Sequence, residues 1–526
     1  LGQARALALT ALKNLGYTPV ATETGVMTSL RRAASFGARR PAPNPAPVLQ
    51  DVRLQQALRL HGYLLHASYH LGSSGTMNFT EAMLRIAAQH GYCAEAAFAY
   101  AARAVNGISN ERIGAATRDA NQARALAEQF PNDATSIRAT TLLSGLVDPW
   151  TGNLDHTLSA LTQNLGRSMA HQDYEFAAVA SAFYATNGLM RGMELGSLKR
   201  VLSEQVADIA PLQHITGINI AQFVQQIVGS LLGQTSADAE ADRNAQPNIS
   251  NPEDAAAHGY VYVLRLYYAI LFQDFQGAEN ILALAAKYAP ALAGSPLTLM
   301  WKFGEALVHI RRADAAGLRQ AKRNLRTLKR WRRNGAAHAE PKLLLLQAEL
   351  EWQRGATTQA LEHYELAAEK ARHLGCANDE ALAYELAARA CEDRGRSDFA
   401  RLFAGNAYQA YLRWGATAKA NQMERDFHAL LAEGLQPISS SSLSVGDLAD
   451  LTVRDFHTAS TTLESTEFNA RILDTTTVLR AAQTISGEIL LDRVLTKLLR
   501  LALEHAGAQK ACMLLAHDRR LFVEAM

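Results

Sequence analysis

Between residues 342 and 431 one short pattern occurs twice, and it restricts what this chain can fold into. Gly355 and Gly395 lie 40 residues apart, and each follows a stretch with the apolar periodicity of a helix. Each is followed by mostly small residues at the spacing of one helix face: Ala360, Tyr364 and Ala367 in the first copy, Ala400, Ala404 and Ala407 in the second. Small side chains here let two antiparallel helices approach closely. The pattern predicts helix-turn-helix pairs that bury their apolar faces only by stacking on one another.

The same pattern extends towards the N-terminus, where Ala278, Leu282 and Ala285 have the same offsets and Pro290 follows them. Helical periodicity continues through most of 50–434, so we expect a mostly α chain in which this region forms one α-α superhelix. The predicted helices are 51–71, 78–91, 94–105, 111–130, 133–145, 154–170, 174–189, 198–209, 216–232, 255–272, 275–288, 297–312, 315–333, 342–354, 357–374, 379–394, 397–414 and 417–431.

Other segments flank this helical region. Residues 1–37, with predicted helices at 2–15 and 27–36, are expected to be the helical tail of a preceding module. The proline-rich sequence in 38–49 predicts a stiff linker. The run PISSSSLS lies within 435–471, which we expect to be a flexible linker. Because the chain starts at Leu1 and stops within a strand pattern at Met526, we expect an internal fragment of a longer protein.

The last segment, 472–526, has a different pattern. Two predicted helices, 475–486 and 490–505, precede the runs KACMLLAH and RLFVEAM. These runs predict two strands joined by a tight turn at 518–519. A hairpin of two strands is marginally stable by itself. We therefore expect the sheet to which it belongs to continue beyond Met526.

Composition and motifs argue against several functions. The formal net charge of +2 creates no strong field towards nucleic acid or membrane, and no apolar run reaches the roughly 18 residues of a membrane span. Scattered cysteines without a CxxC motif predict a reduced, cytoplasmic chain; they are Cys93, Cys376, Cys391 and Cys512. The sequence contains no GxxxxGK[ST] phosphate loop and no kinase catalytic loop. We assign no catalytic, cofactor-binding or metal-binding residue and expect this segment not to be an enzyme.

Three clusters of residue types that can form sites are interpreted as structural. His61, His66 and His70 share one predicted helix, but no cysteine or carboxylate lies nearby to complete a metal site, so ordinary helix-surface histidines are expected. A row of carboxylates is expected to be a solvated helix face; it comprises Glu362, Glu365 and Glu369. Large aromatic residues between helices are expected to be packing anchors rather than a ligand cage; they are Trp352, Tyr364 and Trp414. Cys512 is expected to be inert in a buried strand.

Residues 319–333 form the strongest charge feature, a basic helix face without acidic residues. Its members are Arg319, Lys322, Arg323, Arg326, Lys329, Arg330, Arg332 and Arg333. Such a face can follow phosphates or lie on an anionic membrane. The alternative is a solvated ridge that acidic residues of the next helix pair, such as Glu349 and Glu351, partly neutralise. We favour this alternative and expect no binding to nucleic acid.

Three segments resemble one family of bacterial signalling proteins. AYLRWGATAKANQME (410–424) is similar to the end of that family's tetratricopeptide-like helical region, and HQDYEFAAVASAFYATNGLMRG (171–192) is similar to an earlier helix pair. Residues 475–515 resemble the start of a GAF domain: a helix, a Ser-Gly-Glu break, a leucine-rich helix, Ala-Gly-Ala and a strand. Members of the family join a serine/threonine kinase, a P-loop ATPase, the helical region, a GAF domain and often a sensor histidine kinase.

The resemblance implies that 50–434 are tetratricopeptide-like repeats and that 472–526 are the incomplete start of a GAF domain. The chain would be the regulatory or scaffolding middle of a signal-transduction kinase. It would couple an upstream ATPase or kinase to a GAF sensor and hold a protein partner in its concave groove. ATP would act in modules outside this chain, and the GAF ligand is not specified. The alternatives are the helical region of an ATP-dependent transcription activator and a scaffold without enzymatic activity.

An apolar face in 475–486 predicts self-association. Leu479, Ala482 and Ile485 lie on one side of this predicted helix, and the segment before it offers little surface to cover them. Apolar stripes at near-heptad spacing commonly pair with a partner helix. We therefore expect a homodimer in which this helix packs against its copy.

Overall fold

The computed structural model describes residues 2–17, 46–70, 76–152, 154–209, 216–234, 249, 254–292, 294–435, 513–517 and 520–525. The chain divides into two compact units, Leu1–Gln436 and Pro437–Met526. The described residues are mostly helical, which confirms the predicted mostly α class. None of the helices among them is long and apolar enough to cross a membrane.

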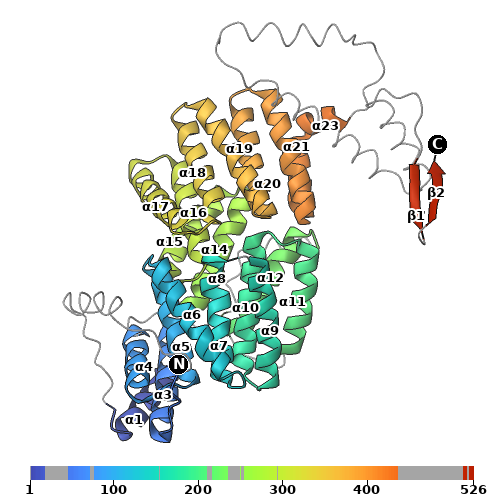
Figure 1. Ribbon diagram of the computed structural model, residues 1–526. Helices are drawn as coiled ribbons and strands as arrows, with labels where there is room; N and C mark the ends of the chain where they lie inside the picture. Colours follow the sequence, from blue (N-terminus) through green and yellow to red (C-terminus); the bar gives the residue numbers. More distant parts are fainter. Residues whose placement is uncertain are drawn as a thin grey trace, which may run out of the picture. The chain divides into compact units, whose positions relative to one another are not determined.

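The first unit consists of helices that follow one another along the chain (Figure 1). Among the described residues, the π-helical η1 and the 3₁₀-helical η3 interrupt the series. The bounds are α1 Gly2–Asn14, α3 Val52–His70, α4 Thr76–His90, α5 Ala94–Ser109, α6 Ile113–Gln129, α7 Ala134–Leu142, η1 Leu143–Val147, α8 Asp148–Thr151, α9 Leu154–Ala170, α10 Tyr174–Arg191, α11 Leu195–Ile209, α12 Thr216–Leu231, α14 Ala255–Leu271, α15 Phe275–Tyr288, η3 Ala289–Leu292, α16 Leu297–Arg312, α17 Ala315–Arg333, α18 Ala339–Gln353, α19 Thr357–His373, α20 Ala377–Asp393, α21 Ser397–Trp414, α22 Thr417–Asp426 and α23 His428–Leu435.

The predicted helix pairs are present, and α18 packs on α19 as α20 packs on α21. Gly355 and Gly395 each follow the first helix of a pair, with φ angles of 82° and 67°. Glycine adopts this left-handed conformation without steric penalty, which lets the chain reverse direction after the helix. The small residues identified from the sequence are fully buried, as are both alanines of the α15 copy; they are Ala360, Ala367, Ala400, Ala404, Ala407, Ala278 and Ala285.

Two predicted helices are interrupted in the structure, and three others are longer than predicted: α5 ends at Ser109, α11 begins at Leu195 and α18 begins at Ala339. The helix expected at 133–145 ends at Leu142 and continues as the π turn η1, which contains Gly145. A Cβ atom at Gly145 would lie 2.0 Å from the Phe183 ring, so glycine lets α10 pack closely against this turn. The helix expected at 417–431 is divided at Phe427, whose side chain is buried under the Arg389 guanidinium.

Part of the predicted linker 38–49 is integrated into the fold. Leu49 is buried, and its amide donates to the carbonyl of Tyr92, whose own amide donates to Pro47. Val48 forms an isolated parallel bridge with Tyr92. Helix α1 packs against α3 and buries Leu12. The sequence predicted a linker because prolines favour extended backbone. Extended backbone can also pair with a neighbouring segment, as residues 47–49 do here.

Helices that are distant in sequence also meet. Asn378, at the start of α20, donates its amide to the Leu189 carbonyl at 3.2 Å and to the Tyr267 hydroxyl at 2.9 Å. Arg191 donates to the Gly375 carbonyl, and Gln422 donates to the Phe272 carbonyl. In a linear solenoid each repeat contacts only its neighbours. This unit instead brings α20 and α22 against α10 and the end of α14.

In the second unit the described residues form an antiparallel pair, β1 Met513–His517 and β2 Arg520–Ala525, where the sequence predicts two strands. Leu514 pairs with Val523 and His517 with Arg520, and the register is irregular after Met513. The predicted helices 27–36, 475–486 and 490–505, most of the linker 435–471, the turn 518–519 and Cys512 lie outside the described residues.

Candidate functional site

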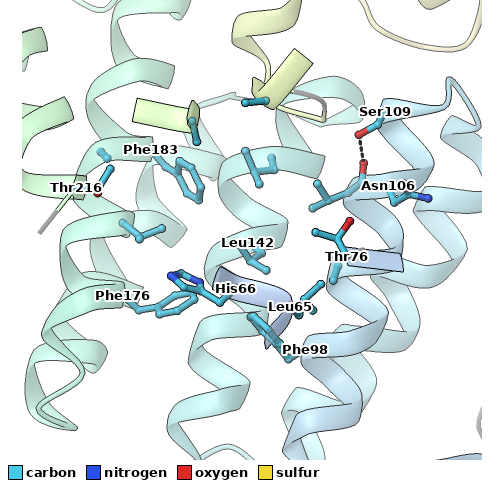
Figure 2. Close-up of a pocket in the computed structure, with 18 of the residues that line it drawn as sticks. Leu65, His66, Thr76, Phe98, Asn106, Ser109, Leu142, Phe176, Phe183 and Thr216 are labelled. Carbon is cyan, nitrogen blue, oxygen red and sulfur yellow. Dashed lines mark hydrogen bonds between the residues drawn. The ribbon is translucent and has the colours of Figure 1, made fainter. Parts of the chain in front are cut away.

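A hollow of about 220 Å³ lies between the helices of the N-terminal half. Figure 2 shows side chains from α3, α5, α7, α10 and α12 converging on it. Its wall is largely apolar and includes Leu65, Phe98, Val105, Leu142, Leu146, Phe176, Val179, Phe183, Ile220 and Pro290. We call it the central hollow. A cavity of this size and chemistry suits one apolar group of a ligand or protein partner.

Glycine sets the position of one wall of the central hollow. A Cβ atom at Gly217, which lines it, would lie 2.5 Å from the backbone carbonyl atoms of Ala178. Helices α10 and α12 therefore approach more closely here than any side chain would permit. The neighbouring Thr216 hydroxyl donates to Asp254, a fully buried residue whose other carboxylate oxygen accepts from the Ala257 amide and caps α14. This network joins α12 to α14 at the edge of the hollow.

Polar groups on the wall are satisfied within the fold. The hydroxyl of Thr80 donates to the Thr76 carbonyl, and that of Ser109 donates to the Val105 carbonyl. The Nε2 atom of His66 lies 2.9 Å from a carboxylate oxygen of Glu175. Because these groups already have partners, a ligand needs no charged group inside the central hollow.

Two further hollows adjoin the central one. The first, of about 340 Å³, shares His66, Phe98 and Phe176 with it. Its lining includes the pair in which Arg59 donates to Glu95 at 2.9 Å. It also includes Arg138, which donates to Asp173 behind the wall at 2.6 Å. This charged end could orient a polar ligand, whereas the central hollow could not.

The second neighbour, of about 300 Å³, shares Ser109 and Pro290 with the central hollow. Three tryptophans line it: Trp150, Trp301 and Trp331. The rings of Trp150 and Trp331 meet edge to face with centroids 5.0 Å apart. The ion pair of Lys302 and Glu305 also lines this hollow. The tryptophans supply a large, rigid contact surface on which an apolar or aromatic group can pack.

The three hollows follow one another along α5 through the lining residues that they share, and we call them together the α5 groove. Phe98 marks the charged end, and Ser109 marks the tryptophan end. At 1.5 Å per residue, this part of α5 is about 17 Å long. At about 3.3 Å per residue, an extended segment of about five residues would span that length.

Two of the three histidines that share α3 have described side chains. His61 is buried, its Nδ1 atom lies 2.7 Å from the Ala57 carbonyl, and burial lowers its pKa. The expectation of an ordinary surface histidine was therefore wrong for His61. His66 lies on the wall of the α5 groove, and the side chain of His70 is outside the described residues. Across the described part of the chain, no group of three or more His, Cys, Asp or Glu residues is placed to hold a metal ion.

The other clusters lie where packing would put them. Glu362, Glu365 and Glu369 are exposed along α19, and the pKa of Glu365 is raised by partial burial and by Glu362. Trp414 and Tyr364 are fully buried, and the Tyr364 hydroxyl donates to Glu349 at 2.8 Å. Trp352 is half-buried beneath the guanidinium of Arg394.

The basic helix is α17, and the acidic residues expected to neutralise it have other partners. Glu349 accepts from Arg311, and Glu351 lies 2.6 Å from His363 Nδ1. The two examples were therefore wrong, although α18 does lie against α17, because periodicity does not show which acidic side chain reaches which cation. At the end of α17, Arg330 pairs with Glu111 and Arg332 with Glu340.

One buried cluster could not be foreseen from the sequence. Cys376 Sγ lies 3.6 Å from His338 Nδ1, and beside them Lys342 donates to Asp379 at 2.5 Å. A cysteine, a histidine and an aspartate can form a nucleophilic site. Here burial raises the pKa of Cys376 to about 12, so the thiol stays protonated, and the adjoining space is only about 20 Å³. We therefore interpret the cluster as structural.

The same cluster predicts a loss of stability in mild acid. Burial, reinforced by Lys342, lowers the pKa of His338 to about 4. Between pH 6.5 and 5 the unfolded chain therefore binds a proton at this residue that the folded chain does not. Stability should fall as the pH falls, by up to about 1.4 kcal/mol per pH unit from this residue. Urea unfolding of the chain and of His338→Gln, measured at several pH values, should show a shallower pH dependence for the variant. If the free energy of unfolding falls equally steeply with pH in the chain and in the variant, His338 is not the group responsible.

The sequence matches no model of a known protein family, and a search of curated proteins also gave no match. The assignment of a function therefore depends on the residues and on the α5 groove. Sequence reasoning missed this groove because its walls come from segments between 59 and 331 that only the tertiary structure brings together. The one local signal is the occurrence of large rings at Phe98, Phe176 and Phe183 within alanine-rich helices.

Proposed function

We propose that the helical region 50–434 is a protein-binding module whose α5 groove holds an extended segment of a partner protein. The three adjoining hollows along α5 are the observation that supports this proposal. The backbone hydrogen bonds of helices are used internally, so such a region recognises partners through side chains. The central hollow would take one large apolar side chain, and the charged and tryptophan-lined ends would fix the direction of the segment.

On the resemblance in sequence, we further propose that this module is of tetratricopeptide type. It would be the regulatory middle of a cytoplasmic bacterial signalling kinase, between an upstream ATPase or kinase and a GAF sensor. The antiparallel β1 and β2 strands agree with the expected start of a GAF domain, and the homodimer through 475–486 belongs to the same proposal. In this arrangement the segment itself is not catalytic. The groove segment would come from a partner protein or from the ATPase or kinase module.

Selection from a library of random peptides tests the groove. Peptides displayed on phage and selected on the chain should converge on sequences of about five residues with a central large apolar residue. Ala102 is half-buried on the wall of the central hollow. Ala102→Trp should fill that hollow and weaken binding of the selected peptides at least about tenfold, the effect of losing roughly 1.4 kcal/mol.

A matched control separates this effect from a general effect of added tryptophan. Ala315 is exposed at the start of α17, so Ala315→Trp adds the same side chain away from the α5 groove. Peptide affinity should be unchanged in this control. If selection yields no common sequence, or if Ala102→Trp binds the selected peptides as the original chain does, the α5 groove is not the binding site.

A further inference from the structure

The middle of α17 carries cations that remain without a carboxylate partner. Lys322, Arg326 and Lys329 are exposed, and no carboxylate in the described part of the chain lies within 4.0 Å of their charged nitrogens. Their spacing of four and three residues places them on one face of the helix. Like charges in such a row repel one another, so an anionic partner at this face would be attracted and would relieve the repulsion.

These three cations line a hollow of about 320 Å³ between α17 and α18. Its apolar residues are Leu325, Leu343 and Leu350, and its remaining lining residues are Gln347, Glu351 and Arg354. Leu343 and Leu350 are largely buried and Leu325 is half-buried, whereas the cations are exposed. We call this hollow the basic groove. It combines an apolar interior with a cationic edge, and none of its lining residues lines the α5 groove.

We propose that the basic groove binds an acidic, leucine-containing segment of a partner protein. Carboxylates of that segment would pair with Lys322, Arg326 and Lys329, and a leucine side chain would enter between α17 and α18. The cations of the basic groove favour an anionic partner. The leucines that line the basic groove favour a partner that also carries apolar side chains. The basic groove is separate from the α5 groove, and its partner does not depend on what the α5 groove binds.

The lining residues favour a protein segment over other anions. Single-stranded nucleic acid is held by aromatic rings that stack on its bases, and the residues lining this groove include no aromatic side chain. A bilayer surface is contacted by apolar side chains that project outward, whereas these leucines lie at the bottom of a hollow.

Direct binding to the full chain tests the proposal. The probe is a fluorescein-labelled synthetic peptide in which leucines recur every three or four residues between glutamates, followed by fluorescence anisotropy. A second peptide with glutamine in place of every glutamate should bind at least about tenfold more weakly. Affinity for the acidic peptide should also fall as salt is raised from about 50 to 200 mM, because the charges are exposed.

Charge reversal on one helix supplies a matched pair of variants. Lys322→Glu, Arg326→Glu and Lys329→Glu together should weaken binding of the acidic peptide at least about tenfold. The control combines Arg319→Glu, Arg323→Glu and Arg333→Glu, which make the same change in net charge at exposed positions outside the groove. Its affinity should change less than about twofold. Thermal unfolding of both variants shows whether each is folded before its affinity is compared.

Each other outcome would overturn the proposal. Equal weakening in the two triple variants would indicate general attraction to a basic helix. If the glutamine peptide binds as tightly as the acidic peptide, the cations of the basic groove do not recognise carboxylates. Tighter binding of an oligothymidylate or of phosphatidylglycerol vesicles, lost in the groove variant, would assign the surface to nucleic acid or to membrane. Absence of binding to the acidic peptide would leave the groove without this function.

Discussion

Replacing Glu385 with alanine should reduce the free energy of unfolding by about 3–5 kcal/mol. Glu385 is fully buried in α20 and accepts from Lys419 Nζ at 2.8 Å and from the Tyr411 hydroxyl at 2.6 Å. Lys419 is itself fully buried, and burial lowers its pKa. Removing the carboxylate leaves this cation in the interior without its counterion. Chemical denaturation monitored by circular dichroism measures the change.

A double variant separates the cost of the unpaired charge from the value of the pair. Glu385→Leu combined with Lys419→Met replaces both charges with apolar side chains, and it should recover most of the stability lost in Glu385→Ala. The pair joins α20 to α22 near the contacts that bring these helices against α10 and α14. If the double variant is less stable than Glu385→Ala, the loss of stability comes from the lost attraction within the ion pair and not from the unpaired lysine.

Gly217→Ala should destabilise the fold towards the upper end of the roughly 1–3 kcal/mol expected of overpacking. The added Cβ would lie 2.5 Å from the backbone of Ala178, and backbone atoms cannot move aside as a flexible side chain can. Since Gly217 also lines the central hollow, the shift of α12 against α10 should weaken peptide binding in the α5 groove.

The same helix contains the control for this prediction. Gly229 also lies in α12, but a Cβ atom there would meet no atom within 4 Å. Gly229→Ala should therefore stabilise the fold by about 0.5–1 kcal/mol through its higher helix propensity. In urea unfolding, Gly217→Ala should lower the free energy of unfolding and Gly229→Ala should raise it. A loss of stability in both, or a gain in both, would contradict the close approach of α10 and α12.

Local features of the fold followed from the sequence alone. Apolar periodicity predicted the helices, and several bounds agree at both ends, as for Phe275–Tyr288 and Ser397–Trp414. The positions of Gly355 and Gly395 predicted the reversals, because a left-handed residue after a helix is a local requirement that glycine meets. Buried Ala360 and Ala404 followed from the same reasoning. These features depend on neighbours within one helix or one helix pair, so the order of residues contains the necessary information.

Contacts between distant segments were decided only by the tertiary structure. The sequence identified the cations of α17 but could not show that Glu349 and Glu351 pair elsewhere, because periodicity identifies a polar face without identifying what lies opposite. It could not place Cys376 beside His338, or Asn378 against the end of α10. The α5 groove also required the tertiary structure, since its walls come from helices spread between 59 and 331. Helix formation is governed by interactions within a few residues, whereas a groove is the space left when many such helices pack.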